Sequence, residues 1–283
     1  MVAPATAAGK SDNVSDAAPW RRIPRTRTAR HGMSQTDKRV ILITGGGGDI
    51  GSVAAVAFAA RGYRVAVCDV RLEAAQATVD AVRGAGGEAD AFGTDIGDAA
   101  AVAALFEQIA QRYGRLDAAF NNAGLGGGGI PLADISEEDW ERNVRVNLSG
   151  TWRCMKHEIK LMLAHGGGAI VNNCSILGLN GGANASYTAT KHGIAGLTKS
   201  AAVSYAGQGV RVNAVCPGLI EAGLGLNVIK RGEDALRRFV ALHPAGRPGT
   251  AMEVVNAVLW LCSDEASFIH GHMLPVDGGY SSH

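Results

Sequence analysis

Tyr187 and Lys191 are the two residues whose types and spacing most directly suggest chemistry. The phenol and the ammonium belong to residues that stand four apart in the sequence, and residues i and i+4 of a helix share one face, one turn apart. A phenol exchanges protons poorly at neutral pH. A neighbouring positive charge favours the phenolate, which would let Tyr187 exchange a proton with an alcohol or carbonyl. Ser175, which follows an apolar run, could hydrogen-bond the same oxygen. A Tyr–Lys pair alone is most often structural, so the rest of the chain must decide.

A glycine-rich turn between an apolar run and an Ala-rich helix predicts an anion site. Residues 39–44 are typical of a strand buried in a parallel sheet, and the glycine turn follows directly. Backbone N–H groups and the positive end of the next helix would point at a phosphate, and the missing side chains let it approach. Gly46, Gly48 and Gly51 match the dinucleotide fingerprint in the required strand–turn–helix context.

A second predicted strand, residues 64–70, places Asp69 about twenty residues beyond the glycine turn. A carboxylate there can accept hydrogen bonds from both ribose hydroxyls and repel a 2′-phosphate. We therefore predict NAD(H), with NADP(H) as the less favoured cofactor. Arg71 keeps the second choice open, because its guanidinium could tolerate the phosphate. Asp69 could also be only a turn residue at a strand end.

Strands and helices alternate along the chain, which predicts a doubly wound α/β sheet with a ligand crevice at the carboxyl ends of its strands. A long helical stretch, residues 137–164, carries Asn147 in its middle. Asn is a mediocre residue inside a helix, so we expect a local kink or a bound water there. Residues 219–247, rich in glycine and basic groups, are typical of a lid over substrate. Their basic pairs indicate a solvated face, or a patch for an acidic carrier protein or carboxylate substrate.

Composition limits the classes of function. The 283 residues are 47% hydrophobic and carry a formal charge of +1, so no long-range field favours nucleic acid or an anionic membrane. No apolar run approaches the roughly 20 residues of a membrane span. The five cysteines are scattered without a CxxC motif, which predicts reduced thiols in a cytoplasmic protein. His270 and His272 lack a third ligand nearby, so a turn is predicted there and no metal site.

Residues 1–38 differ from the rest, with seven basic residues against three acidic ones. They lack the apolar core of a secretory signal and loosely resemble a transit peptide. We predict a disordered basic tail, or a chain that truly starts at Met33. Residues 39–283 would then form one nucleotide-binding domain.

From about residue 39 to the C-terminus the chain resembles the short-chain dehydrogenase/reductase family. Each motif is modest alone, but together they stand in the family's order at predicted strand ends. They are Thr44-Gly45…Gly51, Asp95, Asn121-Asn122-Ala123-Gly124, Asn147, Ser175, Tyr187-xxx-Lys191, Pro217-Gly218 and Val276-Asp277-Gly278-Gly279.

The resemblance implies a single-domain Rossmann-like fold with a seven-stranded parallel sheet, assembled as a homotetramer. Tyr187 would be the general acid/base, and Ser175 would orient the substrate oxygen. Lys191 would favour the phenolate and bind the nicotinamide ribose, and Asn147 would hold a water that relays protons. The expected cofactor contacts are Gly45, Gly48, Asp49, Ile50, Gly51, Asp69, Val70, Asp95, Ile96, Asn122, Ala123, Gly124, Tyr187, Lys191, Pro217, Gly218 and Ile220.

Two positions depart from the family pattern TGxxxGxG and from its usual residues after Pro217-Gly218. Asp49 stands where the middle glycine belongs, and an acid there would repel pyrophosphate unless it caps the next helix, as we expect. Ala222 stands where the family often has a Thr that contacts the nicotinamide carboxamide. That contact must come from backbone, from Ile220, or be absent.

The leading hypothesis is an oxidoreductase that transfers hydride between NAD(H) and a small secondary alcohol or ketone, cyclic or hydrophobic. One alternative is a 3-oxoacyl-carrier reductase that uses NADPH, against which Asp69 counts. A second alternative is a non-catalytic member that binds nucleotide. The complete set of Ser175, Tyr187 and Lys191 argues against it.

Overall fold

The computed structural model describes residues 38–127 and 129–282. The predicted basic tail and Met33 therefore lie outside the described residues, apart from Lys38. The described chain contains a seven-stranded sheet in the order β3-β2-β1-β4-β5-β6-β7, with every neighbouring pair parallel. The strands are β1 (Val40–Thr44), β2 (Arg64–Asp69), β3 (Glu88–Gly93), β4 (Ala118–Asn121), β5 (Gly168–Asn173), β6 (Val210–Pro217) and β7 (Met273–Val276).

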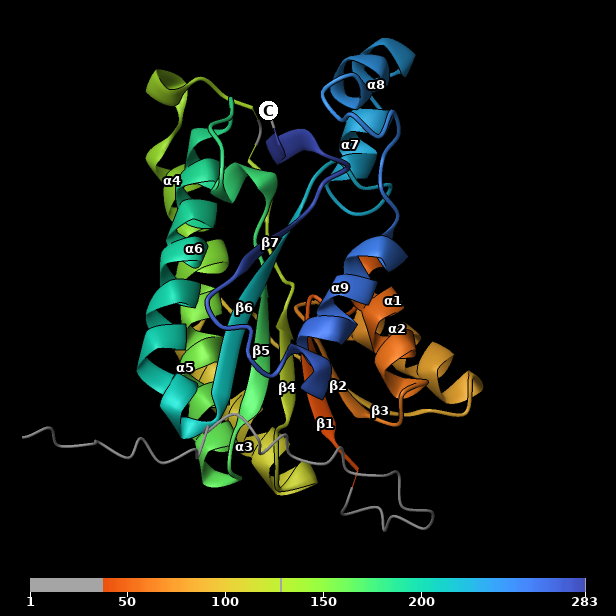
Figure 1. The fold of residues 1–283 in the computed structure, drawn as a ribbon, viewed down its shortest axis with the longest axis vertical. Helices are drawn as coiled ribbons and strands as arrows, with labels where there is room; N and C mark the ends of the chain where they lie inside the picture. Colours follow the sequence, from red (N-terminus) through yellow and green to blue (C-terminus); the bar gives the residue numbers. More distant parts are fainter. Residues whose placement is uncertain (1–37, 128, 283) are drawn as a thin grey trace, which may run out of the picture. The chain divides into compact units, whose positions relative to one another are not determined.

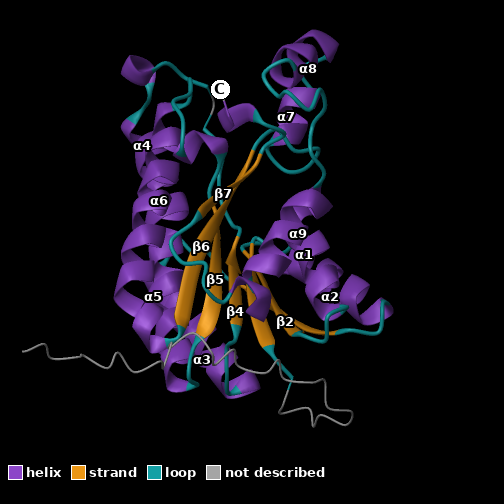
Figure 2. Cartoon of the chain, in the orientation of Figure 1, coloured by secondary structure: helices purple, strands orange, loops and turns teal. Residues whose placement is uncertain are grey.

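Helices cover both faces of this sheet (Figures 1 and 2). The helices are α1 (Asp49–Ala59), α2 (Leu72–Gly84), α3 (Ala99–Tyr113), α4 (Glu137–Asn143), α5 (Thr151–Ala164), α6 (Ala185–Tyr205), α7 (Gly225–Ile229), α8 (Glu233–Val240) and α9 (Ala251–Leu261). Short 3₁₀ turns occur at Leu132–Asp134, Ile176–Gly178, Ala206–Gln208, Asp264–Ala266 and Tyr280–Ser282.

Strand β1 shows why its sequence is a continuous apolar run. All five of its residues are buried, because successive side chains point to opposite faces and both faces are covered. Ile41 and Ile43 join the core beneath α1, α2 and α9, whereas Val40 and Leu42 join the core beneath α3, α5 and α6. The predicted doubly wound fold is confirmed, and the strand order reverses between β1 and β4, where such sheets form a ligand crevice.

The predicted helical stretch 137–164 is confirmed, with a defect at its centre. A π-helical segment, Val144–Gly150, joins α4 to α5 and contains Asn147. The Asn147 side chain is turned to the neighbouring loop, where its Oδ1 accepts from Leu125 N at 2.7 Å and its Nδ2 donates to Leu125 O at 2.9 Å. The Asn147 carbonyl instead accepts a bond from Thr151 Oγ1 at 2.7 Å. The helix is therefore irregular at Asn147, and such a π-helical segment is one of the usual causes of the kink that was expected there.

Glu158 is a buried acid on α5, next to the carboxyl end of strand β4. Its Oε2 accepts from Asn121 Nδ2 at 3.0 Å, and Asn121 Nδ2 also donates to Asn172 Oδ1 at 3.0 Å. Within the described residues, Glu158 Oε1 and Asn121 Oδ1 have no protein partner. Burial raises the pKa of Glu158 from 4.5 to about 8, and the Asn121 hydrogen bond opposes this only in part. The carboxyl is therefore neutral at pH 7.

We expect Glu158→Gln to remove a pH dependence from the stability of the fold. The folded state binds this proton more tightly than the unfolded chain, so its stabilising effect is complete below about pH 4.5 and lost as pH rises through about 8. The difference between the two pKa values corresponds to roughly 4 to 5 kcal/mol of unfolding free energy. Urea unfolding at pH 5, 7 and 9 measures how this free energy changes with pH. The wild type should lose stability relative to the variant as pH rises, whereas Glu107→Gln on exposed α3 surface should track the wild type. Parallel curves for wild type and Glu158→Gln would contradict the assignment.

Candidate active site

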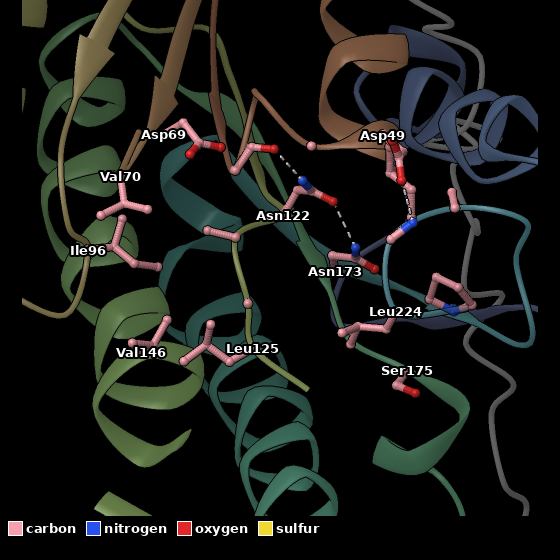
Figure 3. A pocket seen from close by; sticks show the side chains of 18 of the residues that line it. Asp49, Asp69, Val70, Ile96, Asn122, Leu125, Val146, Asn173, Ser175 and Leu224 are labelled. Carbon is pink, nitrogen blue, oxygen red and sulfur yellow. Dashed lines mark hydrogen bonds between the residues drawn. The ribbon is translucent and has the colours of Figure 1, made fainter. Parts of the chain in front are cut away.

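One cavity of about 480 Å³ lies along the carboxyl ends of the strands. Figure 3 shows Asp69 and Val70 toward one end, Ser175 and Leu224 toward the other, and Asn122 and Asn173 between them. Nearly all the predicted site residues line it. The two that do not are Gly51, which lies beneath the glycine turn, and Asn147, which lies behind Leu125. The lining residues that the sequence analysis did not single out for the site include Thr94, Leu125, Arg142, Arg145, Val146, Asn173, Cys174 and Leu224.

The glycine turn is shaped as an anion cradle. Gly45 has φ +63°, and a Cβ there would lie 2.8 Å from Ala123 Cα. A Cβ at Gly51 would collide with the Gly45 carbonyl oxygen. Any side chain at either position would therefore push the turn away from the loop after β4 or from the start of α1. The N–H groups of Gly46, Gly47 and Gly48 donate to oxygens of the protein, so the part placed to receive a phosphate is the N-terminus of α1, which begins at Asp49 on the cavity wall.

Asp69 closes one end of the cavity. Its Oδ2 accepts from Gly47 N at 3.1 Å and its Oδ1 accepts from Arg71 N at 3.0 Å. These bonds fix the carboxylate between the glycine turn and the end of β2. The Arg71 guanidinium lies 4.0 Å from Asp69 Oδ1, and its side chain is 71% exposed. A carboxylate held in this way retains lone pairs for two hydroxyl groups.

Asp95 is fixed from both sides. Its Oδ1 accepts from Gly97 N at 2.8 Å and its Oδ2 accepts from Arg145 at 2.8 Å. Partial burial acts to raise the pKa of Asp95, but the hydrogen bonds from Arg145 and Gly97 outweigh it and hold the pKa below its ordinary value. With both oxygens engaged, Asp95 is arranged to support the wall next to Ile96. Arg145, from the π-helical segment, was not anticipated.

A hydrogen-bonded series links the glycine turn to the Lys191 side of the cavity. Asn122 Nδ2 donates to Gly45 O at 3.1 Å, and Asn173 Nδ2 donates to Asn122 Oδ1 at 2.9 Å (dashed in Figure 3). Lys191 Nζ donates to Asn173 O at 2.7 Å. Asn173 was missed by sequence reasoning, although its position at the end of a buried strand, two residues before Ser175, was an available signal. Thr44 Oγ1 also accepts from Asn122 N and Ala123 N, each at 3.1 Å, which links the end of β1 to the loop after β4.

Tyr187 and Lys191 lie in the first turns of α6, one turn apart as predicted. Asn184 caps this helix, and its Oδ1 accepts from Tyr187 N at 3.4 Å. Lys191 Nζ stands 5.3 Å from the centre of the Tyr187 ring, and the lysine is 4% exposed. Ser175 Oγ accepts from Leu177 N at 3.1 Å, which leaves its hydroxyl proton available for a ligand. The structure brings all three side chains to one wall of the cavity.

The expectation that Asp49 caps the helix after the glycine turn is wrong. The N-cap of α1 is Gly48, which has no side chain to accept a hydrogen bond from the first turn, and Asp49 is already the first helical residue. From there the Asp49 carboxylate reaches outward, and its Oδ2 accepts from Gly223 N at 2.7 Å. The reason is tertiary: the chain after β6 brings an N–H group within reach of the carboxylate.

The two ends of the segment that follows β6 are hydrogen-bonded to each other. Gly249 N donates to Leu219 O at 2.8 Å, and Glu221 N donates to Gly249 O at 2.8 Å. Leu219 N also donates to the buried His243 at 3.0 Å. The predicted lid segment, which holds α7 and α8, is therefore anchored at both ends. Pro217, Gly218, Ile220 and Ala222 line the cavity below it, and Ala222 is 3% exposed.

The described residues were also compared with the requirements of a metal site and of a membrane-spanning helix. Within residues 38–127 and 129–282, no cluster of three or more His, Cys, Asp or Glu side chains is arranged to hold a metal ion. In the same part of the chain, no helix has the length and apolarity that a membrane crossing needs.

Comparison with known proteins identifies the family. A family model described as "Enoyl-(Acyl carrier protein) reductase" matches residues 47–281. The chain is 43% identical over 247 residues to cyclohexanol dehydrogenase of Acinetobacter sp. (strain SE19), covering 87% of this chain and 96% of that protein. It is 42% identical over 246 residues to cis-4-hydroxycyclohexanecarboxylate dehydrogenase of Sinomonas cyclohexanicum, covering 87% and 97%.

Solved structures agree. An actinorhodin polyketide ketoreductase crystallised with NADPH superposes with a TM-score of 0.84 at 35% identity, covering 89% of this chain and 100% of that one. An NAD⁺-bound xylitol dehydrogenase superposes with a TM-score of 0.81 at 31% identity, covering 85% and 98%. The chain belongs to the short-chain dehydrogenase/reductase family. The predicted class, an oxidoreductase acting between secondary alcohols and ketones with a nicotinamide cofactor, is thereby confirmed.

Proposed function

We propose that this protein interconverts a small cyclic secondary alcohol and its ketone, with NAD(H) as the cofactor. The observation that carries the proposal is the placement of Ser175, Tyr187 and Lys191 on one wall of a cavity whose far end holds Asp69. Both a proton-transfer site and a ribose-binding carboxylate therefore open onto one continuous space.

Tyr187 is the proposed general acid/base. The Lys191 ammonium, fixed by the Asn173 carbonyl, stands 5.3 Å from the centre of the phenol ring, beside the group that would exchange the proton. In alcohol oxidation Tyr187 takes the hydroxyl proton, and in ketone reduction it returns the proton to the carbonyl oxygen. Ser175 Oγ donates a hydrogen bond to that oxygen and stabilises the charge that develops on it. Asn147 is the proposed holder of a relay water. The position of its side chain between Leu125 and Thr190 of α6, the helix that carries Lys191, supports this role.

The residues present fit a nicotinamide dinucleotide. The cradle of Gly45, Gly48 and Ile50 suits the pyrophosphate, and Asp69 suits the hydroxyls of the adenosine ribose. The cofactor, when bound, supplies the hydride-transfer chemistry. The chain positions it through the set predicted above, with Val70, Asp95, Ile96 and Asn122 toward the adenosine half. Lys191, Pro217, Gly218 and Ile220 lie toward the nicotinamide half.

A cyclic substrate is supported by the two relatives, whose names specify cyclohexanol and a hydroxycyclohexane carboxylate. Apolar side chains also stand on the cavity wall, including Leu125, Val146 and Leu224. Absorbance of NADH during incubation with cyclic and linear secondary alcohols, using NAD⁺ and NADP⁺ in parallel, tests the proposal. Oxidation of ring alcohols with a preference for NAD⁺ supports it, whereas a clear preference for NADP⁺ defeats the cofactor assignment.

A 3-oxoacyl-carrier reductase that uses NADPH is the second candidate, favoured by the 35% identity over 243 residues to the 3-oxoacyl-[acyl-carrier-protein] reductase of Thermotoga maritima. Asp69 opposes it, because its carboxylate repels a 2′-phosphate. Reduction of an acyl-carrier thioester with NADPH, and no oxidation of ring alcohols, would select it. NADH binding without turnover of any alcohol or ketone would instead select a non-catalytic nucleotide-binding role.

We also propose a cytoplasmic homotetramer. Large apolar side chains exposed on this chain, among them Trp152 on α5, Val203 on α6 and Phe268, support contacts between copies. All five cysteines are free and buried, as suits a reducing compartment. Light scattering coupled to size-exclusion chromatography tests the assembly, and a monomeric mass would refute it.

A further inference from the structure

One hydrogen bond joins two parts of the cavity wall that lie far apart in the sequence. Asp49 Oδ2, on the first residue of α1, accepts from Gly223 N at 2.7 Å across 174 positions (Figure 3). Gly223 has φ +52° and lies in the turn that opens the predicted lid segment. The phosphate cradle and the start of the lid segment are thus held together by a carboxylate.

Asp49 is the tether between this turn and the cofactor side of the cavity. Within the described residues, the other backbone hydrogen bonds of residues 222–227 are local, such as Gly225 N to Ala222 O at 3.0 Å. Next to Gly223, the Leu224 side chain faces the cavity and packs against Gly126, where a Cβ would lie 2.8 Å from Leu224 Cδ2. The position of Gly223 therefore sets the position of Leu224 on the substrate side.

The same carboxylate carries a charge beside the cradle. Asp49 is the residue between Gly48 and Ile50, and all three residues line the cavity where the pyrophosphate is expected. A carboxylate near a diphosphate raises the free energy of the bound cofactor by Coulomb repulsion. The Gly223 N–H offsets part of that charge, because an N–H donor to a carboxylate is a charge-assisted bond.

We infer that Asp49 is a positioning residue: it ties the lid segment to the phosphate cradle, fixes Leu224 over the substrate, and moderates cofactor affinity. This inference rests on the proposed function for its substrate and cofactor. Two separable effects follow, one from the acceptor oxygen and one from the charge.

Three variants separate these effects. Asp49→Asn keeps an acceptor oxygen and removes the charge, whereas Asp49→Ala removes both. Asp49→Gly introduces the residue usual in the family and serves if the alanine variant is poorly folded. The matched control is Glu73→Gln, an exposed acid in the first turn of α2, which removes the same charge at another helix start.

Three measurements apply to the full chain: fluorescence titration with NADH, KM for the oxidised alcohol, and hydrogen exchange of residues 222–230 without ligand. Loss of the charge should tighten NADH binding about threefold to tenfold in all three Asp49 variants. Loss of the acceptor should raise the alcohol KM and the exchange rate of residues 222–230 about threefold to tenfold in the alanine and glycine variants. The asparagine variant, which keeps an uncharged acceptor, should exchange at a rate closer to the wild type than the alanine variant does, and Glu73→Gln should change nothing.

Unchanged exchange in both Asp49→Ala and Asp49→Gly would overturn the tether. Unchanged or weaker NADH binding in all three variants would overturn the effect of the charge. Failure of the proposed function is recognised separately, since the wild type would then oxidise no alcohol while the exchange comparison still gives its result.

Discussion

Tyr187→Phe is expected to reduce kcat for alcohol oxidation by about 10²- to 10⁴-fold, the range typical for loss of a general acid or base. The phenylalanine ring preserves the side-chain volume on the wall of the cavity. Only the oxygen that exchanges the proton is removed, so NADH binding should stay near the wild-type value. Steady-state kinetics and NADH fluorescence titration on the same preparation measure both quantities.

The control for this substitution is Tyr205→Phe, at the last residue of the same helix and away from the cavity. It removes one hydroxyl from α6 and should leave kcat unchanged. Substantial turnover by Tyr187→Phe would mean that another group handles the proton. A simultaneous loss of NADH binding would mean that the hydroxyl supports the cofactor site rather than the reaction.

Asp69→Ser is expected to move the cofactor preference from NAD toward NADP. Removal of the carboxylate takes away charge-assisted hydrogen bonds to the ribose and the repulsion of a 2′-phosphate. Together these are worth roughly 2 to 4 kcal/mol, a change of about 30- to 1000-fold in the ratio of the two kcat/KM values. The nearby Arg71 guanidinium, 71% exposed, is free to turn toward a phosphate.

Two companion variants identify the cause. Asp69→Asn removes the charge and retains one acceptor oxygen, which can serve either the Gly47 or the Arg71 N–H group, so it disturbs the turn less than Asp69→Ser. Asp69→Ser combined with Arg71→Ala should lose much of the gain with NADP, because the guanidinium supplies the attraction. A cofactor ratio that stays constant across these variants would show that Asp69 does not govern the choice.

Sequence periodicity and local chemistry were sufficient for the fold and for most of the cavity. The apolar runs at β1 and β2 predicted buried parallel strands, since strands covered on both faces cannot alternate polar and apolar residues. The spacing of Tyr187 and Lys191 predicted one helix face, and α6 provides it. The irregular helical segment around Asn147 also agrees with the poor fit of Asn inside a helix.

The partners of the polar side chains could not be predicted in this way. Asn173 joins the glycine turn to Lys191 only because β1, β4 and β5 end side by side. Arg145 supports Asp95 because the π-helical segment passes the end of β3. A side chain's hydrogen-bond partner depends on which distant backbone arrives beside it, and local sequence carries no record of that.

Asp49 illustrates the division most clearly. Its residue type and its place beside the phosphate turn were evident in the chain, and they predicted a charged group in need of a donor. Local reasoning assigned that donor to the start of α1, whereas the folded chain supplies it from Gly223, 174 positions away. Residue types and spacing determined the sheet, the cofactor turn and the proton-transfer pair. The tertiary structure alone decided which donors meet which acceptors, because those pairings require the long-range strand order to bring them within about 3 Å.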